Sequence, residues 1–263
     1  MRPVIALISD FGTRDHYAGT MKGVILGICP EATLVDITHD VAPHDVVEGA
    51  LQLAASARYF PAGTVFLIVV DPGVGSARRG IAVEAGDFRF VAPDNGVLTE
   101  VLRETPPRKI VELSERRYAR PTVTRTFEGR DRFAPAAAWL AKGTQITALG
   151  RTLPDFHRVD MPLPDTSNPT VLAGVVLLVD RFGNLVTNID RKTFESFAKQ
   201  GEFRIVAGDA PVGRLVSTYA EIGANEVCAL FGSSDHLELA ANAASAAHSL
   251  GLVKGATVQI RRD

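Results

Sequence analysis

The chain has 263 residues, of which 46% are hydrophobic and 22% charged, and its formal net charge is -2. This length suffices for one large domain or two smaller ones with apolar cores. The charge shows no basic excess of the kind that binding to a nucleic-acid backbone requires, and no uninterrupted apolar run of about 18 residues indicates a membrane span. We therefore expect a cytoplasmic protein whose partners are neither nucleic acids nor membranes.

Strand-like and helical patterns alternate at the start of the chain. We expect strands at residues 4–9 and 34–37, helices at 17–28 and 45–60, and then an apolar strand at 65–70. An apolar run without alternation is typical of a strand that is buried on both faces of a parallel sheet. The order of these elements predicts βαβ units and therefore an N-terminal α/β domain with a mostly parallel sheet.

Acidic residues follow two of these strands. Asp71 ends the third strand and precedes the loop PGVGSARR, from which Arg78 and Arg79 can fold back toward the acid. Asp10 and Asp15 flank the turn after the first strand. Because open α/β sheets bind ligands at the carboxyl ends of their strands, these acids are candidate site residues. The alternative is that they cap turns and helices and that the arginines are solvated.

The middle of the chain continues the same pattern. It predicts a strand at residues 89–92, a helix near 98–103 and an alanine-rich helix at 135–141. The polar segment 128–131 precedes the last of these helices, where charged groups either bind a ligand or simply cap an exposed helix.

The composition changes at the segment MPLPDTSNP, which contains three prolines. We predict an N-terminal domain of residues 1–161, a linker at 162–169 and a C-terminal domain of residues 170–263. Short strands separated by glycine-containing turns follow, which predicts a smaller β domain of the barrel or sandwich type.

Two loops of this second domain carry candidate binding groups. The segment DRFGNLVTNI, which begins at Asp180, places Phe182 and Asn184 around a glycine, where they could stack on a flat ring and hydrogen-bond its edge. The segment FGSSDHLELAANAAS offers Ser233 and Ser234 before a predicted alanine-rich helix, whose N-terminus could bind a carboxylate or a phosphate. Each segment alone also fits an ordinary turn or helix cap.

The cysteines and histidines show no metal-binding pattern. Cys29 and Cys228 lack the spacing of a metal site, and they suit apolar positions better than a disulfide. The six histidines include no helical i, i+4 pair with a third ligand. We expect neither a metal nor a cofactor.

Seven segments, in order and over nearly the full length, closely resemble the S-adenosylmethionine (SAM) hydrolases. These enzymes are also called SAM hydroxide adenosyltransferases and are related to the SAM-dependent fluorinases and chlorinases. The segments are SDFGTRDHYAGTMKG, DITHDVAPHDVVEGA, VDPGVGSARR, APDNGVLT, FEGRDRFAPAAA, DRFGNLVTNI and FGSSDHLELAANAAS.

The resemblance implies both an architecture and a reaction. It implies an N-terminal α/β domain, a C-terminal β domain, and a homotrimer whose active sites lie where the N domain of one subunit meets the C domain of the next. Water or hydroxide would attack C5′ of the ribose in line with the sulfonium of SAM, releasing adenosine and L-methionine without a metal.

The resemblance also implies roles for individual residues. Asp10 would hold the ribose hydroxyls, Asp15 would lie near the amino group of the methionine part, and His44 lies in a loop that closes over the ligand. The remaining candidates fall around the adenine (Phe182, Asn184 and Tyr219) and in the region of the methionine end (Asp180, Ser233 and Ser234).

One catalytic position departs from the family. Asp71 and Arg78 match two members of an Asp-Arg-His group that orients the attacking water, but the family sequence Phe-His-Gly-Arg-Asp has Glu128 in place of the histidine here. If Glu128 points into the pocket, the three side chains carry a net charge of about -1, which suits a cationic sulfonium, disfavours hydroxide and lets a carboxylate act as general base on neutral water. Asp71 itself stands where the resembling halogenases carry an uncharged residue, and its carboxylate would repel chloride or fluoride. Alternatively, Glu128 forms a salt bridge with Arg78 or Arg130, and activity is reduced or lost.

Two other functions stay open at this point. With one presumed catalytic residue replaced, the chain could bind adenosine or SAM without converting it. It could also act on another 5′-substituted adenosine, because the adenine and ribose positions match the family better than the methionine end does.

Overall fold

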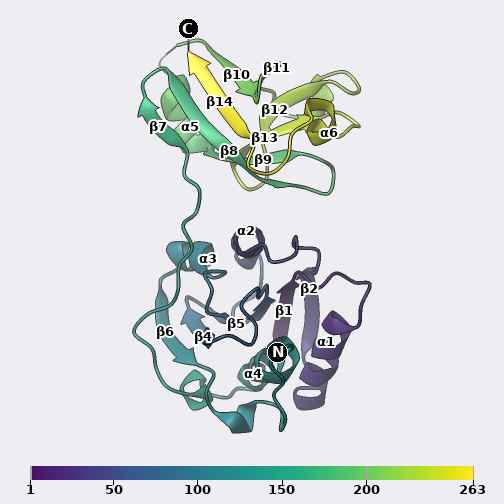
Figure 1. The fold of residues 1–263 in the computed structure, drawn as a ribbon, viewed down its shortest axis with the longest axis vertical. Helices are drawn as coiled ribbons and strands as arrows, with labels where there is room; N and C mark the ends of the chain where they lie inside the picture. Colours follow the sequence, from purple (N-terminus) through teal and green to yellow (C-terminus); the bar gives the residue numbers. More distant parts are fainter. Residues whose placement is uncertain (1, 200, 263) are drawn as a thin grey trace. The chain divides into compact units, whose positions relative to one another are not determined.

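The computed structural model describes residues 2–199 and 201–262. The chain divides into two compact units, Met1–Asp160 and Met161–Asp263 (Figure 1). No helix within the described residues is long and apolar enough to cross a membrane.

The N-terminal unit is built on a six-stranded sheet with the order β2-β1-β3-β5-β4-β6. β1, β2, β3 and β5 run parallel, and β4 runs antiparallel to both of its neighbours. This arrangement confirms the predicted α/β class with a mostly parallel sheet. The strands are β1 (Val4–Ser9), β2 (Thr33–Thr38), β3 (Val65–Val69), β4 (Gly80–Ala85), β5 (Phe88–Pro93) and β6 (Pro107–Glu112).

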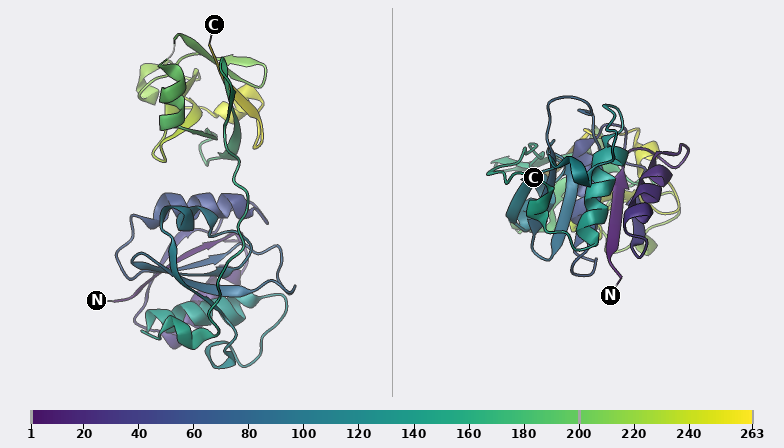
Figure 2. Two further views of the ribbon diagram at one scale, coloured as in Figure 1. Left: turned by 90° about the vertical axis from the view of Figure 1, so that its left-hand side faces the viewer. Right: turned by 90° about the horizontal axis from the view of Figure 1, so that it is seen from below.

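Helices cover both faces of this sheet, as the left view of Figure 2 shows. α1 (Tyr17–Ile28) and α4 (Ala134–Ala141) pack on one face, and α2 (Val46–Ala57) and α3 (Thr99–Glu104) pack on the other. The amide of Glu48 donates to the side chain of Asp45 at 3.0 Å, so Asp45 caps α2. Short 3₁₀ turns lie at Arg116–Tyr118 and Ile146–Leu149, and a π-helical turn, Gly129–Phe133, leads into α4.

β3 supplies both cores. Val65, Leu67 and Val69 belong to the core on the α1 side, whereas Phe66 and Ile68, with Val70 just after the strand, belong to the core on the α2 side. The strand is buried throughout, which explains its unbroken apolar sequence. Because β3 lies inside the sheet, between β1 and β5, its carboxyl end places Asp71 at the middle of the edge where ligands of such sheets bind.

The C-terminal unit is an antiparallel, barrel-like sheet with the order β11-β10-β14-β8-β9-β13-β12, and β7 pairs with β8. The first half of β8 pairs with β14 and its second half with β9, so the long strand carries the sheet around a corner. This confirms the predicted smaller β domain. The strands are β7 (Asp165–Asn168), β8 (Val171–Val179), β9 (Leu185–Asp190), β10 (Phe203–Ala207), β11 (Ala210–Val212), β12 (Val227–Phe231), β13 (His236–Ala241) and β14 (Thr257–Arg262).

The helices of this unit are α5 (Arg191–Ala198) and α6 (Ala246–Leu250), with a 3₁₀ turn at Tyr219–Glu221. The expectation of a helix directly after Ser233 and Ser234 is wrong, because that segment forms β13 and the next helix begins only at Ala246. Leu237 and Leu239 enter the main core from alternate positions, and this period of two is typical of a strand. Strand β7 lies within the stretch that we interpreted as a linker, 162–169.

Candidate active site

A cavity of about 290 Å³ lies in the N-terminal unit where β1 and β3 end. It combines three carboxylates with three aromatic rings. Its lining residues are Asp10, Phe11, Tyr17, Pro43, His44, Val69, Asp71, Val74, Thr126, Phe127, Glu128 and Gly129. The structure therefore brings together four of the predicted site residues, Asp10, His44, Asp71 and Glu128, from distant parts of the chain.

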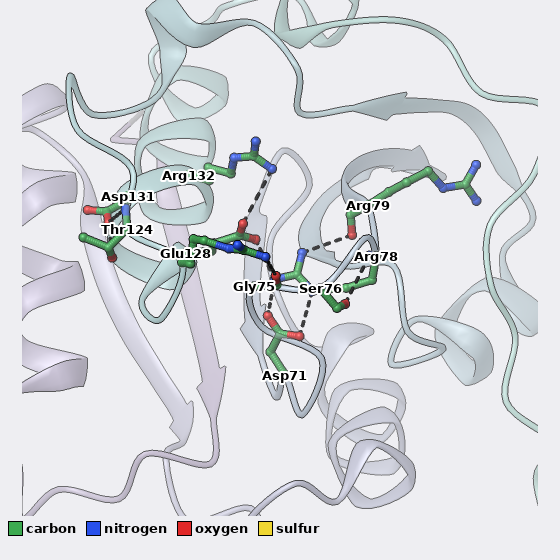
Figure 3. Close-up of polar contacts among 10 residues, drawn as sticks. Asp71, Gly75, Ser76, Arg78, Arg79, Thr124, Glu128, Asp131 and Arg132 are labelled. Carbon is green, nitrogen blue, oxygen red and sulfur yellow. Dashed lines mark hydrogen bonds and ion pairs between the residues drawn. The ribbon is translucent and has the colours of Figure 1, made fainter.

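Arg78 joins two of these carboxylates (Figure 3). Its Nε donates to Asp71 Oδ1 at 2.8 Å and its Nη2 donates to Asp71 Oδ2, while the same Nη2 donates to Glu128 Oε2 at 2.6 Å. The side chains of Asp71, Arg78 and Glu128 are only 6%, 10% and 12% exposed. Charge-assisted, two-pronged contacts of this kind fix the orientation of all three groups.

The loop between Asp71 and Arg78 is shaped by local backbone bonds. The amide of Val74 donates to the Asp71 carbonyl at 3.2 Å, and Ser76 Oγ accepts from the Arg78 amide at 3.2 Å. Gly75 has a φ of 79°, and a Cβ there would lie 2.4 Å from the Arg125 carbonyl oxygen. Only glycine fits this position, so the loop can turn tightly enough to bring Arg78 back over Asp71.

The segment that follows Glu128, residues 129–132, is fixed by hydrogen bonds to the buried Asp131. Asp131 is fully buried and accepts from the amide and hydroxyl of Thr124, at 2.8 and 2.7 Å, and from Arg130 Nε at 2.7 Å. Arg130 is therefore engaged by Asp131, and the structure shows the salt bridge of Glu128 with Arg78 and not with Arg130. Glu128 Oε1 also lies 3.7 Å from Nη1 of the partly exposed Arg132 (Figure 3).

The electrostatics of the group favour one proton acceptor. Burial raises the pKa of Asp71 above its usual value, the charge of Glu128 adds to this increase, and the bonds to Arg78 offset it only in part. Burial opposes the charge on Arg78, but its bonds to both carboxylates raise its pKa, so the guanidinium remains charged. The raised pKa makes the Asp71 carboxylate a better proton acceptor than an ordinary exposed aspartate.

Arg79 does not fold back toward Asp71, so that expectation is wrong. Its side chain bonds Asp94 at 2.6 Å and Asp155 at 2.9 Å, on the side away from the Asp71–Arg78 pair (Figure 3). Asp94 also accepts from the His157 amide at 2.7 Å. Arg79 thus connects β4 to the last segment of the unit and has a structural role.

The acids after β1 differ in position. Asp10 lines the cavity, and its Oδ2 accepts from the His44 amide at 2.9 Å. His44 has a φ of 68°, a conformation that costs energy in any residue other than glycine and is common at ligand sites. Asp15 is exposed and is not among the residues that line the cavity.

Three aromatic side chains of the cavity were missed by the sequence-based prediction of site residues. The ring centroids of Phe11, Tyr17 and Phe127 lie 5.2–5.8 Å apart and form a continuous apolar wall. All three lie inside the segments SDFGTRDHYAG and TFEGRD, next to the predicted acids. Their position beside those acids was the available signal.

A hydrogen-bond network that begins at the buried pair Ser9 and His39 and ends at the surface supports the loop that carries Asp10. Ser9 Oγ lies 2.7 Å from His39 Nδ1, His39 Nε2 lies 3.0 Å from Asp36 Oδ1, and Asp36 pairs with Lys22 at 2.5 Å. The order serine, histidine, aspartate is that of a hydrolytic triad, but Ser9 is 0% exposed and cannot reach a substrate. The network instead joins the ends of β1 and β2.

The candidates of the C-terminal unit form a separate group. Phe182, Asn184 and Tyr219 line a cavity of about 570 Å³ together with residues 241–244. Asp180 fixes their loop, since its Oδ1 accepts from the amides of Phe182 and Asn184 and its Oδ2 accepts from Asn184 Nδ2, each at 2.8 Å. Phe182 is 78% exposed, which is unusual for a large apolar ring.

Ser233 and Ser234 are not among the residues that line this cavity. Ser233 is exposed, and the Ser234 carbonyl bonds His236 Nδ1 at 2.9 Å. In the described part of the chain, no group of three or more His, Cys, Asp or Glu side chains is arranged to hold a metal ion.

Both units of the chain match sequence profiles of one known family. The profile of the SAM hydroxide adenosyltransferase N-terminal domain matches residues 5–150, and that of the C-terminal domain matches residues 174–259. The chain belongs to the SAM hydroxide adenosyltransferase family. The resemblance of its seven segments is thereby confirmed at the level of the family.

Full-length relatives carry two kinds of name. An (R)-S-adenosyl-L-methionine hydrolase of Thermus thermophilus is 39% identical over 99% of this chain and 100% of its own length. A fluorinase of an Actinoplanes species is 33% identical over 99% of this chain and 98% of its own length. A solved structure of a conserved Thermotoga maritima protein covers 98% of this chain and 100% of that one, at 35% identity and a TM-score of 0.91.

Proposed function

We propose that this protein hydrolyses S-adenosyl-L-methionine to adenosine and L-methionine. The observation that carries the proposal is the Asp71–Arg78–Glu128 group, buried on the wall of a cavity at the carboxyl edge of the sheet. The SAM hydrolase names of relatives such as the Thermus protein support the same reaction.

The reaction requires two things of the protein, namely alignment of water with the bond between C5′ and sulfur and one group that accepts a proton. The oxygen of a water molecule bonds to C5′ of the ribose while the bond from C5′ to sulfur breaks, and its electron pair converts the sulfonium into the neutral thioether of methionine. No acid is needed for the leaving group. Asp71 accepts the proton of the water, and Arg78, itself bonded to Glu128, holds Asp71 in place, so catalysis rests on positioning and electrostatics.

The charge of the cavity favours water over halide as the nucleophile. Asp10, Asp71 and Glu128 all line it, and Arg78 neutralises only part of their charge. This field stabilises a cationic sulfonium but repels chloride and fluoride at contact distance. The fluorinase names among the relatives therefore do not extend to our proposal for this chain.

The other candidates fit the nucleoside part of SAM. Asp10 commits Oδ2 to the His44 amide, and no described residue hydrogen-bonds its Oδ1, which we assign to the ribose hydroxyls. The exposed ring of Phe182 and the neighbouring Tyr219 offer apolar faces for adenine, and Asn184 offers a hydrogen-bonding amide. We further propose that no cofactor or metal takes part, because the sulfonium is already an activated leaving group.

Product analysis tests this function directly. The purified protein is incubated with SAM, with and without a chelator or chloride, and the products are separated by chromatography. We expect equal amounts of adenosine and methionine in every arm, and no 5′-chloroadenosine. Tight binding of SAM without any product would instead identify a binding protein, and turnover of another 5′-substituted adenosine alone would identify a different substrate.

Neutralising Glu128 is expected to move the pH dependence of the reaction. In Glu128→Gln the negative charge that raises the pKa of Asp71 is lost, so the pKa of Asp71 falls and the acid limb of the kcat/KM profile moves to lower pH. A weaker base and a less constrained Arg78 should lower kcat roughly tenfold. Glu128→His, which restores the family residue, should remain active, and the acid limb of its kcat/KM profile should also move to lower pH.

The control is Glu112→Gln, at the end of β6, which breaks a surface ion pair between Glu112 and Arg151. This variant should leave the pH dependence of kcat/KM unchanged. If neither Glu128 variant changes the rate or the pH dependence, Glu128 has no part in tuning Asp71.

We also propose that the protein works as a homotrimer in the cytoplasm. The family resemblance supports the trimer, and the two unpaired cysteines, Cys29 and Cys228, favour a reducing compartment. Light scattering after size-exclusion chromatography should give three times the chain mass of 28.1 kDa. A monomer that turns over SAM would contradict the trimer.

A further inference from the structure

The segment APDNGVLT forms a turn, residues 93–96, beside the end of the strand that carries Asp71. The register between β3 and β5 ends at Leu67 and Val91, whereas the register between β3 and β1 continues to Val69. The next residue, Val70, is fully buried and directly precedes Asp71. Because a buried carbonyl needs a hydrogen-bond donor, the peptide before Asp71 depends on a segment outside the strand ladder.

Asn95 supplies this donor from the turn. Its Nδ2 donates to the Val70 carbonyl at 2.8 Å, and its Oδ1 accepts from the Val97 amide at 3.2 Å. The second bond is local, and it fixes which end of the side-chain amide faces Val70. Gly96 has a φ of 97°, and a Cβ there would lie 2.9 Å from the Val159 amide nitrogen. The turn is therefore packed closely against the last segment of the unit, and this packing holds Asn95 in place.

The same turn bonds to the other end of the loop. The Asp94 amide donates to the Arg79 carbonyl at 2.9 Å, and Asp94 Oδ2 accepts from Arg79 Nε at 2.6 Å. The Arg79 carbonyl also accepts from Arg78 Nη1 at 3.3 Å (Figure 3). Residues 93–96 thus hold the chain directly before Asp71 and directly after Arg78.

We propose that Asn95 is a positioning residue for SAM hydrolysis, which holds the Val70 carbonyl and thereby fixes the backbone from which Asp71 meets Arg78. This inference rests on the proposed function. Asn95 is not among the residues that line the cavity, so it acts through Asp71 and not by contact with the substrate. The bonded carbonyl belongs to the peptide that leads into Asp71, and rotation of this peptide would displace the carboxylate. A displacement of about 1 Å can lower a rate by about 10²-fold.

The first test replaces Asn95 by serine. The shorter hydroxyl can still accept from the Val97 amide, but it does not reach the Val70 carbonyl. We expect kcat for SAM hydrolysis to fall about tenfold with KM within about twofold, because the bound nucleoside keeps its own partners. The matched control is Asn168→Ser, the same change at an exposed turn where Asn168 Oδ1 accepts from the Thr170 amide. It should change neither value.

A double-mutant cycle shows whether Asn95 acts through Asp71. The value of kcat is measured for Asn95→Ser, for Asp71→Asn and for the two changes together. In the Asp71→Asn background the serine substitution should lower kcat by less than about twofold, since the carboxylate that Asn95 positions is already gone. A tenfold loss in both backgrounds would indicate general damage and would contradict the inference.

The pH dependence of Asn95→Ser has a sign that a purely structural role would not produce. Arg78 bonds the Asp71 carboxylate, and Glu128 and Asp10 line the same cavity. The bonds to Arg78 lower the pKa of Asp71, so a looser contact raises it. The acid limb of the kcat/KM profile should therefore move to higher pH, opposite to the shift expected for Glu128→Gln. A limb that stays in place would contradict the inference.

Hydrogen exchange keeps the result separate from the proposed function. Exchange of the backbone amides is followed by mass spectrometry in the unmodified protein and in Asn95→Ser. Peptides that span residues 71–79 should exchange at least about threefold faster in the variant, while those of α1 stay within about twofold. Faster exchange supports the positioning of Asp71 whether or not the unmodified protein hydrolyses SAM, and unchanged exchange overturns it in both cases.

Folding is checked by thermal unfolding of the same proteins. Asn95→Asp has nearly the shape of asparagine but no donor for the Val70 carbonyl, and it serves as the second variant should Asn95→Ser fold poorly. Its kcat should also fall with KM nearly unchanged. If SAM is hydrolysed and both variants show a lower melting temperature with an unchanged kcat, Asn95 has a structural role only and the inference is wrong.

Discussion

Replacing Asp71 by asparagine is expected to lower kcat for SAM hydrolysis by about 10³-fold, within the range that a positioned general base contributes. The amide retains the shape of the side chain and can still accept a hydrogen bond from Arg78, but it cannot take a proton from water. KM should change little, because Asp71 acts on the nucleophile and the bound nucleoside has other partners. Initial rates of adenosine formation, measured over a range of pH, provide the value.

The matched control for this variant is Asp155→Asn. Asp155 pairs with the neighbouring Arg79, and its side chain is 69% exposed and outside the cavity lining. That variant should keep full activity. If Asp71→Asn retained a third or more of the rate, Asp71 would not be the proton acceptor, and its role would be limited to orienting Arg78.

Replacing Arg78 by methionine is expected to damage stability and activity together. The variant would leave the carboxylates of Asp71 and Glu128 buried with no guanidinium between them, and loss of one partner of a buried ion pair costs about 3–5 kcal/mol. Urea unfolding should show this loss near neutral pH. The control Arg151→Met removes an arginine that is 70% exposed in its pair with Glu112, and it should cost at most about 1 kcal/mol.

The pH dependence of Arg78→Met has a definite sign. Without the guanidinium, burial raises the pKa of the Asp71 carboxyl further above the range near about 3.9 that it has in the unfolded chain. The folded state then binds more protons than the unfolded state, so stability relative to the unmodified protein is lost as the pH rises above this range. Adding Asp71→Asn and Glu128→Gln should recover much of the stability at neutral pH but none of the activity. A deficit that is the same at pH 4 and pH 8 would contradict this account.

Much of the N-terminal fold follows from local sequence patterns. The apolar run at Val65–Val69 and the helix α2 each depend on residues that are close together in the chain, so both were predicted. β4 and β6 were not predicted. β4 pairs with β5 across a turn at Gly86, where φ is 53°, and β6 lies at the edge of the sheet with Arg108 and Lys109 exposed. Their strand character depends on partners that the sequence alone does not supply.

The candidate site also combines features that the local sequence predicts with features that it does not. Its acids at strand ends could be predicted, because the position of strand ends follows from the pattern. The choice between Arg78 and Arg79 could not, since adjacent side chains point apart and only the loop geometry decides which one meets Asp71. In the C-terminal unit, the alanines after His236 were interpreted as helical, and this hid the alternation of Leu237 and Leu239 around Glu238.

The π-helical turn before α4 limits which related chains can place a group where Glu128 lies. Within that turn the Ala134 amide donates to the Gly129 carbonyl, five residues back, so the turn holds one residue more than an ordinary helical turn. A relative lacking one residue between Phe127 and Ala134 would form a regular helix, and the side chain at the equivalent of Glu128 would rotate by roughly 100° about the helix axis. Alignments across the family should therefore compare the length of this segment before they compare the identity of the residue at its start.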